Sequence, residues 1–427
     1  MKARLSNALV FMAVMCLTAC GGGNSAPPQE PPPYVPYEGP QLDSASLNAT
    51  LEALVQHTDV PVAGVQLALV VDESLVYAGS AGHAHFDPPQ NLTPQHALRV
   101  ASVSKWITAL AIGVAVERGL LAWDQPVESL LNFSLRPPAQ PDYLPTLAQL
   151  LSHTSGLSDA AGYVIDADET LADWYQRAPA SHWQDTVITG NYFQYANLNY
   201  VVAATALEAA VGMRFDQWVF QMLLQPAGVQ ASFNPEDLAG IATASLFRRE
   251  AGAWVTSFIT GEPVAVAANY QPGMNGGVFS PQGGLRTSVA QLAKLIPWLY
   301  DTPPATALLS NSSLATLRSP RWQFNGNNGD TYGGLFQAYG LGVHCTRDVA
   351  NGDRLLAEGG LTMCGHLGDA YGAVTGVLAD PVGRWGLVYL INGTDRSRDY
   401  SGEFSALYVW EEALIDAAYT AIKSLEH

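Results

Sequence analysis

Two pairs of apolar runs, one near each end of the chain, constrain its fold more than any other feature. The first pair is "VAGVQLALVVDESLVYAGSAG" at 62–82, whose runs flank Asp72-Glu73-Ser74. The second pair lies at 370–394, where the runs flank Pro381-Val382-Gly383. Short apolar runs around turn residues predict β-hairpins. Hairpins near both ends predict an antiparallel sheet to which both ends of the chain contribute.

Helical spacing of apolar residues dominates the sequence between these hairpins. The clearest case is the helix predicted over 104–118, which Gly119 ends. The same periodicity occurs in "SASLNATLEALVQHT", "TLAQLLSHTSGL", "LNYVVAATALEAAVG", "FDQWVFQMLLQPAG" and "GEFSALYVWEEALIDAAYTAIKSL". We therefore predict an α+β fold, in which helices flank the sheet and a mostly helical lobe is inserted at roughly 98–285. A cleft between two such lobes is a favoured place for a binding site.

The N-terminus has the pattern of a bacterial export signal. Lys2 and Arg4 precede the short apolar stretch "ALVFMAVMCL", which is too short to span a membrane as a helix. The following "LTAC" resembles a lipoprotein signal, which implies cleavage before Cys20 and a lipid on its thiol. The alternative is an ordinary signal cut after Ala19. Gly21 is not an acidic retention signal, so we expect the outer membrane, facing the periplasm.

A Gly-rich and then Pro-rich segment follows this signal, and its composition predicts a tether. We therefore assign 1–19 to the signal peptide, 20–40 to the lipid-anchored tether and 41–427 to the folded domain. Without the signal's two cations the chain carries 18 basic and 38 acidic residues, a net charge of −20. It has no basic run, which argues against nucleic-acid binding. We expect contact with a membrane through the lipid anchor only.

The two cysteines beyond the signal, Cys345 and Cys364, are 19 residues apart. Because the chain is expected to be exported, an oxidised pair is plausible and would stabilise the fold by roughly 3 kcal/mol. The alternative is two buried free thiols. Neither cysteine is a nucleophile candidate.

A serine and a lysine three residues apart begin the predicted helix at 104–118. In "SVSK", Ser102 and Lys105 lie on one helical face, where the helix N-terminus adds positive potential. A serine hydroxyl is a weak nucleophile until a neighbouring group takes its proton, and a partly desolvated amine can do so. The pattern alone is weak, and a surface lysine at a helix start would explain it equally well.

Two further motifs occur in order behind it. "QYANLNY" contains Tyr195-Ala196-Asn197, and "MCGHLGDAYG" contains His366-Leu367-Gly368. The order Ser-x-x-Lys, Tyr-x-Asn, His-x-Gly resembles the penicillin-recognising serine hydrolases, in the group of class C β-lactamases, D-alanyl-D-alanine carboxypeptidases and related esterases. "LLSHTSGL", "SPQGGLRTSVAQLAKL" and "YGLGVH" match as well, so the resemblance covers about 45–420. It implies a β-lactamase-like fold.

The resemblance implies a role for each motif residue. Ser102 would be acylated, and Lys105 would hydrogen-bond Ser102 and Tyr195. Tyr195, its pKa lowered by neighbouring cations, would act as general base and then as acid. Asn197 would bind the acyl side of the substrate.

The third motif would line the cleft. His366 would head its sheet-edge strand, and Gly368 would let substrate pass close to the strand. The backbone N–H groups of Ser102 and Asp369 would form the oxyanion hole. We expect no cofactor and no metal.

Two departures from the pattern of carboxypeptidase-like relatives bear on the substrate. Those relatives have a threonine where this chain has Leu367, which offers no hydrogen-bond donor, and an arginine near the position of His344. Asp369 adds a negative charge beside the oxyanion position. An ester or amide with an uncharged leaving side is therefore favoured over a substrate with a free carboxylate.

Other motifs point to different chemistry but are incomplete. His83-x-His85-x-Asp87 resembles the start of a zinc hydrolase site, but proline follows where another histidine is usual. His153 lies beside Ser152 and Ser155, yet adjacent residues do not face one another as a catalytic triad requires. No serine lies in a G-x-S-x-G pattern, which argues against an α/β-hydrolase.

The resulting hypothesis is a tethered serine hydrolase that cleaves an ester or small amide through an acyl-enzyme. The alternatives are a D-alanyl-D-alanine carboxypeptidase or β-lactamase, a protein that binds penicillin or cell-wall peptides without turnover, and a purely structural lipoprotein. Intact Ser102, Lys105 and Tyr195 argue against binding without turnover.

Overall fold

The structure is a computed structural model, and it describes residues 42–184, 190–395 and 400–426. The predicted signal peptide, the predicted lipidation site Cys20 and the predicted tether lie outside the described residues. The helices are α1 Ser44–Gln56, α2 Ser104–Glu117, α3 Leu147–Leu151, α4 Leu171–Gln176, α5 Leu198–Val211, α6 Phe215–Val219, α7 Val289–Leu292, α8 Asn311–Arg318 and α9 Val409–Lys423. None of them is long and apolar enough to cross a membrane.

The strands belong to one large sheet and two small ones. They are β1 Gly64–Val71, β2 Ser74–Phe86, β3 Pro89–Asn91, β4 Leu98–Arg99, β5 Leu246–Glu250, β6 Ala253–Phe258, β7 Arg286–Thr287, β8 Trp322–Gln323, β9 Ala338–Tyr339, β10 His344–Cys345, β11 Cys364–Ala370, β12 Ala373–Asp380, β13 Trp385–Ile391 and β14 Gly393–Thr394.

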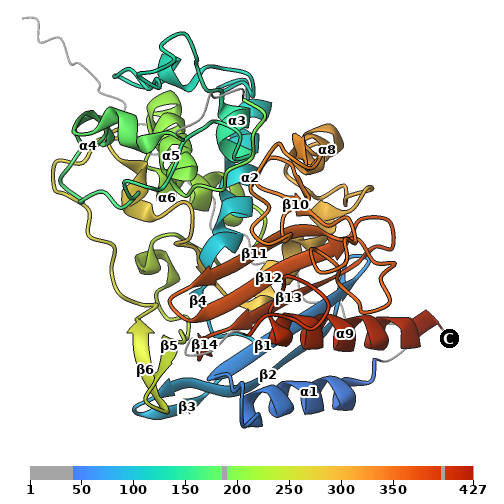
Figure 1. The fold of residues 1–427 in the computed structure, drawn as a ribbon. Coiled ribbons are helices and arrows are strands. Elements are labelled where there is room, and N and C mark those ends of the chain that lie inside the picture. The colour runs from blue at the N-terminus through green and yellow to red at the C-terminus, as the bar shows by residue number, and fades with distance from the viewer. Residues whose placement is uncertain (1–41, 185–189, 396–399, 427) are drawn as a thin grey trace, which may run out of the picture. The chain divides into compact units, whose positions relative to one another are not determined.

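The large sheet joins both ends of the described chain. Its order is β3-β2-β1-β13-β12-β11-β10-β9-β8, and all of its pairings are antiparallel (Figure 1). The two predicted hairpins are β1–β2 and β12–β13, and β1 pairs with β13 to bring them together. The predicted α+β fold with its antiparallel sheet is confirmed.

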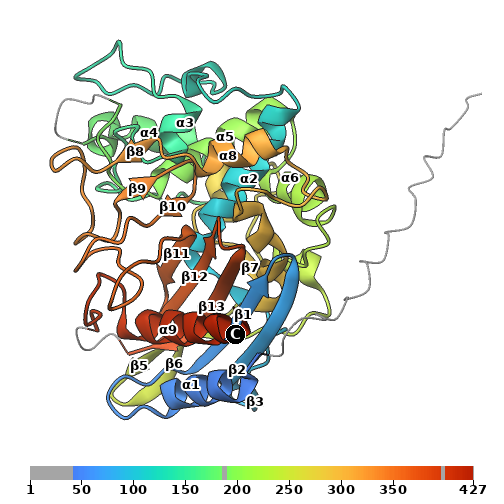
Figure 2. The same cartoon turned by 90° about the vertical axis from the view of Figure 1, so that its right-hand side faces the viewer.

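The alternation of side chains along β1 divides the core into two layers. Val65, Leu67 and Leu69 pack into a cluster with residues of α1 and α9, whereas Ala68 and Val70 pack into a cluster with α2 and α5. Successive side chains of a strand point to opposite faces, so a sheet covered on both sides needs apolar residues at every position. Figures 1 and 2 show α1 and α9 together along the sheet and α2 with α5 away from them.

The segment between the hairpins is less purely helical than predicted. β5 and β6 form a hairpin around Ala251-Gly252 and pair with β14 in a three-stranded sheet, while β4 and β7 form a two-stranded ladder. "LFRREAGAWVTSF" has strand residues on both sides of a glycine turn, and this local signal was overlooked. The two-residue strands have no local signal, because long-range pairing alone creates them.

Candidate active site

Ser102 lies on a tight turn between β4 and α2. The turn is a 3-10 helix over Ala101–Val103, and Ala101 has φ +48°, a left-handed value that is uncommon for a residue with a side chain. The buried hydroxyl of Ser104 donates to Ala101 O (2.7 Å) and accepts from Leu285 N (3.0 Å). These two bonds hold a turn that is unfavourable in isolation. Ser102 itself is half-buried.

Lys105 is fully buried one turn later, and its amine has three polar neighbours. Nζ lies 3.1 Å from Ser102 Oγ, 2.7 Å from Asn197 Oδ1 and 2.9 Å from Gln282 O. Burial lowers the pKa of Lys105 to about 7, although the negative charge of Asp159 acts in the opposite direction. The amine is therefore placed against the candidate nucleophile, with a large neutral fraction near pH 7.

Tyr195 lies against the same amine through its ring. Nζ of Lys105 is 4.8 Å from the ring centroid, and the imidazole of His153 stacks on the ring at 4.2 Å. Although Tyr195 keeps some exposed surface, the protein atoms around its phenol raise its pKa well above the usual value, and a hydrogen bond with Ser102 offsets part of this rise.

The predicted lowering of the Tyr195 pKa is therefore wrong. Desolvation dominates, because the nearest cation, Lys105, is itself buried and loses its proton near neutral pH. The predicted hydrogen bond from Lys105 to Tyr195 is wrong as well. Among the described residues Nζ donates to Ser102 Oγ, Asn197 Oδ1 and Gln282 O, and it meets Tyr195 through the face of the ring.

Asp159 organises this centre and was missed in the sequence. Its carboxylate accepts from the backbone N–H of Asn197 (2.8 Å), from Asn197 Nδ2 (2.9 Å) and from the backbone N–H of Leu198 (2.9 Å). It thereby caps the start of α5 and orients the Asn197 amide so that its oxygen meets Lys105. No local pattern signals this role, because Asp159 lies 38 residues before its partners.

His366 of β11 is buried beside these residues and has both ring nitrogens engaged. Nε2 lies 2.7 Å from Tyr339 Oη and Nδ1 lies 2.6 Å from Leu367 O. Because a carbonyl only accepts, the proton is assigned to Nδ1, and Tyr339 donates to Nε2. Burial, followed by the charge of Lys105, lowers the pKa of His366 well below its usual value. His366 is thus a neutral neighbour of the site, and its contact with substrate stays a prediction.

Gly368 brings β11 against the nucleophile turn. A Cβ at this position would lie 2.4 Å from Thr375 Oγ1 and 2.9 Å from both Ser102 N and Val100 O. Glycine is therefore required for the backbone of β11 to approach Ser102. We predicted glycine at this position so that substrate could pass close to the strand. The structure shows instead that the turn carrying Ser102 lies against Gly368.

Leu367 and Asp369 project from the opposite face of β11. Leu367 is half-buried and packs against the cluster that includes residues of α9. Asp369 is exposed and accepts a hydrogen bond from Tyr408 Oη at 2.7 Å. Leu367 therefore lacks the hydroxyl that a threonine would have at this position. The Asp369 carboxylate is held by its hydrogen bond from Tyr408.

His344 and the two cysteines lie at the other end of β11. β10 pairs with β11 through His344 opposite Gly365 and Cys345 opposite Cys364, and the two cysteines form a disulfide. His344 is buried with its ring 5.0 Å from that of Phe336, and burial lowers its pKa to about 4. It has no exposed surface for a ligand here, so its predicted substrate contact also stays a prediction.

The histidines of the incomplete zinc and triad motifs have structural neighbours. His85 lies on β2 with Nε2 2.7 Å from Thr243 O, and His83 on the same strand packs against Phe86. Among the described residues no three metal-ligating side chains lie together. His153 is buried, and its Nδ1 accepts from the backbone N–H of Ala196 at 3.1 Å. It supports the segment that carries Tyr195.

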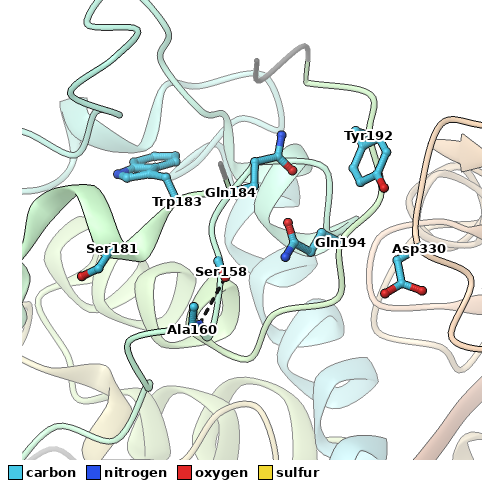
Figure 3. A pocket seen from close by; sticks show the side chains of 8 residues that line it. All are labelled: Ser158, Ala160, Ser181, Trp183, Gln184, Tyr192, Gln194 and Asp330. Carbon is cyan, nitrogen blue, oxygen red and sulfur yellow. Dashed lines mark hydrogen bonds between the residues drawn. The ribbon is translucent and has the colours of Figure 1, made fainter. Parts of the chain in front are cut away.

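A cavity of about 530 Å³ is lined by residues that neighbour Asp159 and Tyr195 in the sequence. Figure 3 shows its lining, Ser158, Ala160, Ser181, Trp183, Gln184, Tyr192, Gln194 and Asp330. The lining does not include Ser102, but Ser158 directly precedes Asp159 and Gln194 directly precedes Tyr195. A hydrogen bond from Tyr332 Oη to Tyr195 O (3.0 Å) ties the loop after Asp330 to this segment.

Comparison with known families assigns the chain to one of them. The family model described as "Beta-lactamase" matches residues 47–408, which is most of the chain. The chain belongs to the beta-lactamase family. The match includes all three motifs that carried the resemblance in the sequence.

Individual relatives of this beta-lactamase-family chain have different names. It is 30% identical to a penicillin-binding protein of Bacillus subtilis over 36% of this chain and 34% of that protein. It is also 30% identical to esterase EstB of Burkholderia gladioli over 46% of this chain and 55% of the esterase. The matches thus span about a third and about half of those two proteins.

A solved structure supports the fold over a longer range. The octameric penicillin-binding protein homologue from Pyrococcus abyssi superimposes with a TM-score of 0.67, covering 89% of this chain and 77% of that one, at 21% identity. At this identity the likeness concerns the fold.

Proposed function

We propose that this protein is a serine hydrolase that cleaves a neutral ester or small amide through an acyl-enzyme on Ser102. One observation carries the proposal, namely the three contacts of Lys105 Nζ. A neutral amine has two N–H groups and one lone pair. As an ammonium, Nζ donates to all three groups. In the neutral form Asn197 Oδ1 and Gln282 O, which only accept, would keep the two N–H groups, and the lone pair would then accept the hydroxyl proton of Ser102.

In this mechanism Lys105 is the base. Ser102 Oγ attacks the substrate carbonyl while its proton passes to Lys105 Nζ, and the resulting ammonium meets the charge of Asp159 through Asn197. Tyr195, protonated at neutral pH, hydrogen-bonds the serine and passes a proton to the leaving oxygen or nitrogen. The Lys105 ammonium then returns a proton to Tyr195, so that the acyl-enzyme again has a neutral amine and a protonated phenol. Water attacks the acyl carbon while its proton passes to Lys105 Nζ. Ser102 Oγ leaves with a proton from Tyr195, and Lys105 restores the proton of Tyr195.

The oxyanion would be held by the backbone N–H groups of Ser102 and Asp369. The close approach of β11 at Gly368 supports this pairing, because a Cβ there would lie 2.9 Å from Ser102 N. Backbone donors held rigidly in place stabilise the developing charge without reorganising.

The preference for an uncharged leaving side rests on β11. Both nitrogens of His366 are already engaged, and the side chain of Leu367, which packs toward α9, supplies no hydrogen-bond donor. A carboxylate at this strand would lose its hydration without gaining a charged partner from these two residues. The esterase among the relatives fits this preference, whereas the penicillin-binding relative favours the alternative of D-alanyl-D-alanine carboxypeptidase or β-lactamase activity.

A labelling experiment tests the nucleophile. The soluble domain should react with a fluorophosphonate probe, Ser102→Ala should not react, and Ser312→Ala on the exposed start of α8 should label like the wild type. Equal labelling of the Ser102→Ala protein would reject the assignment.

A substrate panel tests the specificity. p-Nitrophenyl esters, D-Ala-D-Ala peptides and nitrocefin are compared by kcat/KM on the same preparation, and the neutral ester is expected to be the best substrate. Cleavage of the free-carboxylate peptide alone would contradict the interpretation of Leu367. A stable adduct with penicillin and no turnover of any ester would favour binding without catalysis.

We further propose export as a lipoprotein anchored through Cys20, with the domain facing the periplasm. The disulfide between Cys345 and Cys364 supports an oxidising compartment. Metabolic labelling with an alkyne fatty acid should modify the wild-type protein and not Cys20→Ser. Labelling of both would contradict the anchor.

A further inference from the structure

Two buried arginines lie opposite each other in the β4–β7 ladder, and β4 leads directly into the nucleophile turn. Arg99 of β4 and Arg286 of β7 are register partners in the two-stranded ladder, and they are only 9% and 5% exposed. Like charges directly opposite each other on neighbouring strands are destabilising, and burial adds the cost of removing both guanidinium groups from water. Such a pair calls for a compensating negative charge.

The protein supplies these guanidinium groups with neutral partners. Arg99 Nε donates to Gly283 O (2.7 Å), and its guanidinium lies 4.7 Å from the ring centroid of Phe258. Arg286 donates to three backbone carbonyl oxygens, those of Thr260, Phe233 and Gly284. Among the described residues neither arginine forms an ion pair with a carboxylate.

The nearest acid does not complete the charge balance. Glu262 lies close enough to act on Arg286 electrostatically, but it is exposed and not within ion-pair distance. Burial, with a contribution from Arg99, lowers the pKa of Arg286 to about 10, which still leaves it charged at neutral pH. The pair therefore carries two positive charges against one exposed carboxylate.

Both arginines line a cavity of about 250 Å³, together with Ser280, Phe258 and Glu262 among others. We propose that this cavity is an oxyanion-binding site, in which a carboxylate or phosphate group lies between Arg99 and Arg286. Guanidinium groups match such groups through paired N–H donors, and a partly buried site strengthens each charge-assisted bond. Ser280, which also lines the cavity, carries a hydroxyl that can donate as well.

The site is connected to the catalytic residues through the backbone. Arg99 precedes Ser102 by three residues, and its acceptor Gly283 follows Gln282, whose carbonyl meets Lys105 Nζ. A bound anion would therefore order both segments that hold the nucleophile and its base. The anion could be the remote carboxylate of a substrate's acyl chain or a free ion, and the two sources can be distinguished.

Binding is measured on Ser102→Ala, so the result does not depend on turnover. Phosphate replaces chloride at constant ionic strength, and the melting temperature is followed. We expect a saturable rise that Arg99→Gln weakens at least tenfold in apparent Kd, while Arg321→Gln, which removes an exposed arginine, keeps it. The same response with and without Arg99, or no saturable rise, would overturn the proposal.

A second measurement covers the case in which Arg99→Gln does not fold. Wild-type crystals grown without sulfate or phosphate are soaked in selenate, and anomalous scattering locates the ion. A selenium peak between the two guanidinium groups supports the site. Selenate bound at other positions, with no peak between the two arginines, contradicts it.

Kinetics identify the source of the anion. The ratio of kcat/KM for p-nitrophenyl hemisuccinate to that for p-nitrophenyl butyrate should fall at least tenfold in Arg99→Gln if the acyl chain supplies the carboxylate. An unchanged ratio together with phosphate binding assigns the site to a free anion. Failure of both esters in the wild type would reject the proposed hydrolase and leave the binding result intact.

Discussion

The ionisation of Lys105 gives the sharpest test of the proposed mechanism. With a pKa of about 7, roughly a tenth of the amine is neutral at pH 6 and roughly nine tenths at pH 8. If the neutral amine is the base, kcat/KM for p-nitrophenyl butyrate should rise about tenfold between these values and level off above pH 8. An ordinary lysine would instead give about a hundredfold rise over the same interval, with no plateau below pH 10.

Folding stability should report the same pKa with a definite sign. The folded pKa is about 7 and the unfolded value is 10.5, so between these values the unfolded chain holds the extra proton. Stability therefore increases with pH from about 7 to about 10.5, by at most about 5 kcal/mol for this group, and is independent of its titration below pH 7. Relaxation of the site makes the observed gain smaller.

Two variants and two assays complete the test. Rates are corrected with Ser102→Ala blanks, and urea unfolding is followed from pH 6 to pH 10. Lys105→Met should lose activity, and its free energy of unfolding should no longer rise between pH 7 and pH 10. Lys105→Arg should also lose activity, and because its side chain stays protonated it should be less stable than the wild type across this range. A log-linear rise of kcat/KM continuing to pH 9, or equal pH slopes of stability in wild type and Lys105→Met, would refute the neutral amine as base.

Four further changes test the surrounding structure. Asp159→Asn removes a charge that raises the Lys105 pKa, so the midpoint of the kcat/KM profile should move to lower pH, and an unmoved midpoint would contradict this coupling. Ser104→Ala loses two buried hydrogen bonds and should lower stability by about 2 kcal/mol in urea unfolding; an unchanged midpoint would show that the turn holds without them. Gly368→Ala should cost about 1–3 kcal/mol and at least tenfold in kcat, because its methyl group meets the Ser102 turn; full activity would contradict the close approach. Reducing the disulfide between Cys345 and Cys364 should lower stability by about 3 kcal/mol without moving the pH profile of kcat/KM, and a shifted profile would show that the disulfide shapes the site.

The parts of this structure that were predictable have local signals. The hairpins at 62–82 and 370–394 and the helix behind Ser102 follow from periodicity and turn residues within one segment. Ser102 and Lys105 meet because a spacing of three lies within one helical turn. The contacts of Asp159 and Gln282 have no such signal, since these residues reach Asn197 and Lys105 across 38 and 177 positions of the chain.

The pKa of Tyr195 could not be predicted for a related reason. A motif shows which cation is near, but not how many apolar atoms surround both groups. Here the stacked imidazole of His153 and the full burial of Lys105 decide the balance, and both depend on long-range packing. Desolvation is a property of the assembled core, so its direction follows only from the structure.

Apart from the Asp159 carboxylate, the resting centre carries little charge, and this has a consequence for catalysis. Tyr195 is protonated, His153 and His366 are neutral because burial opposes their charging, and Lys105 is partly neutral. Charge separates only when Ser102 gives its proton to Lys105 and an oxyanion forms. Asn197, oriented by Asp159, already points its oxygen at the amine that becomes positive. The site is thus arranged for the charges of the reaction, and a neutral substrate brings none that would disturb them before it reacts.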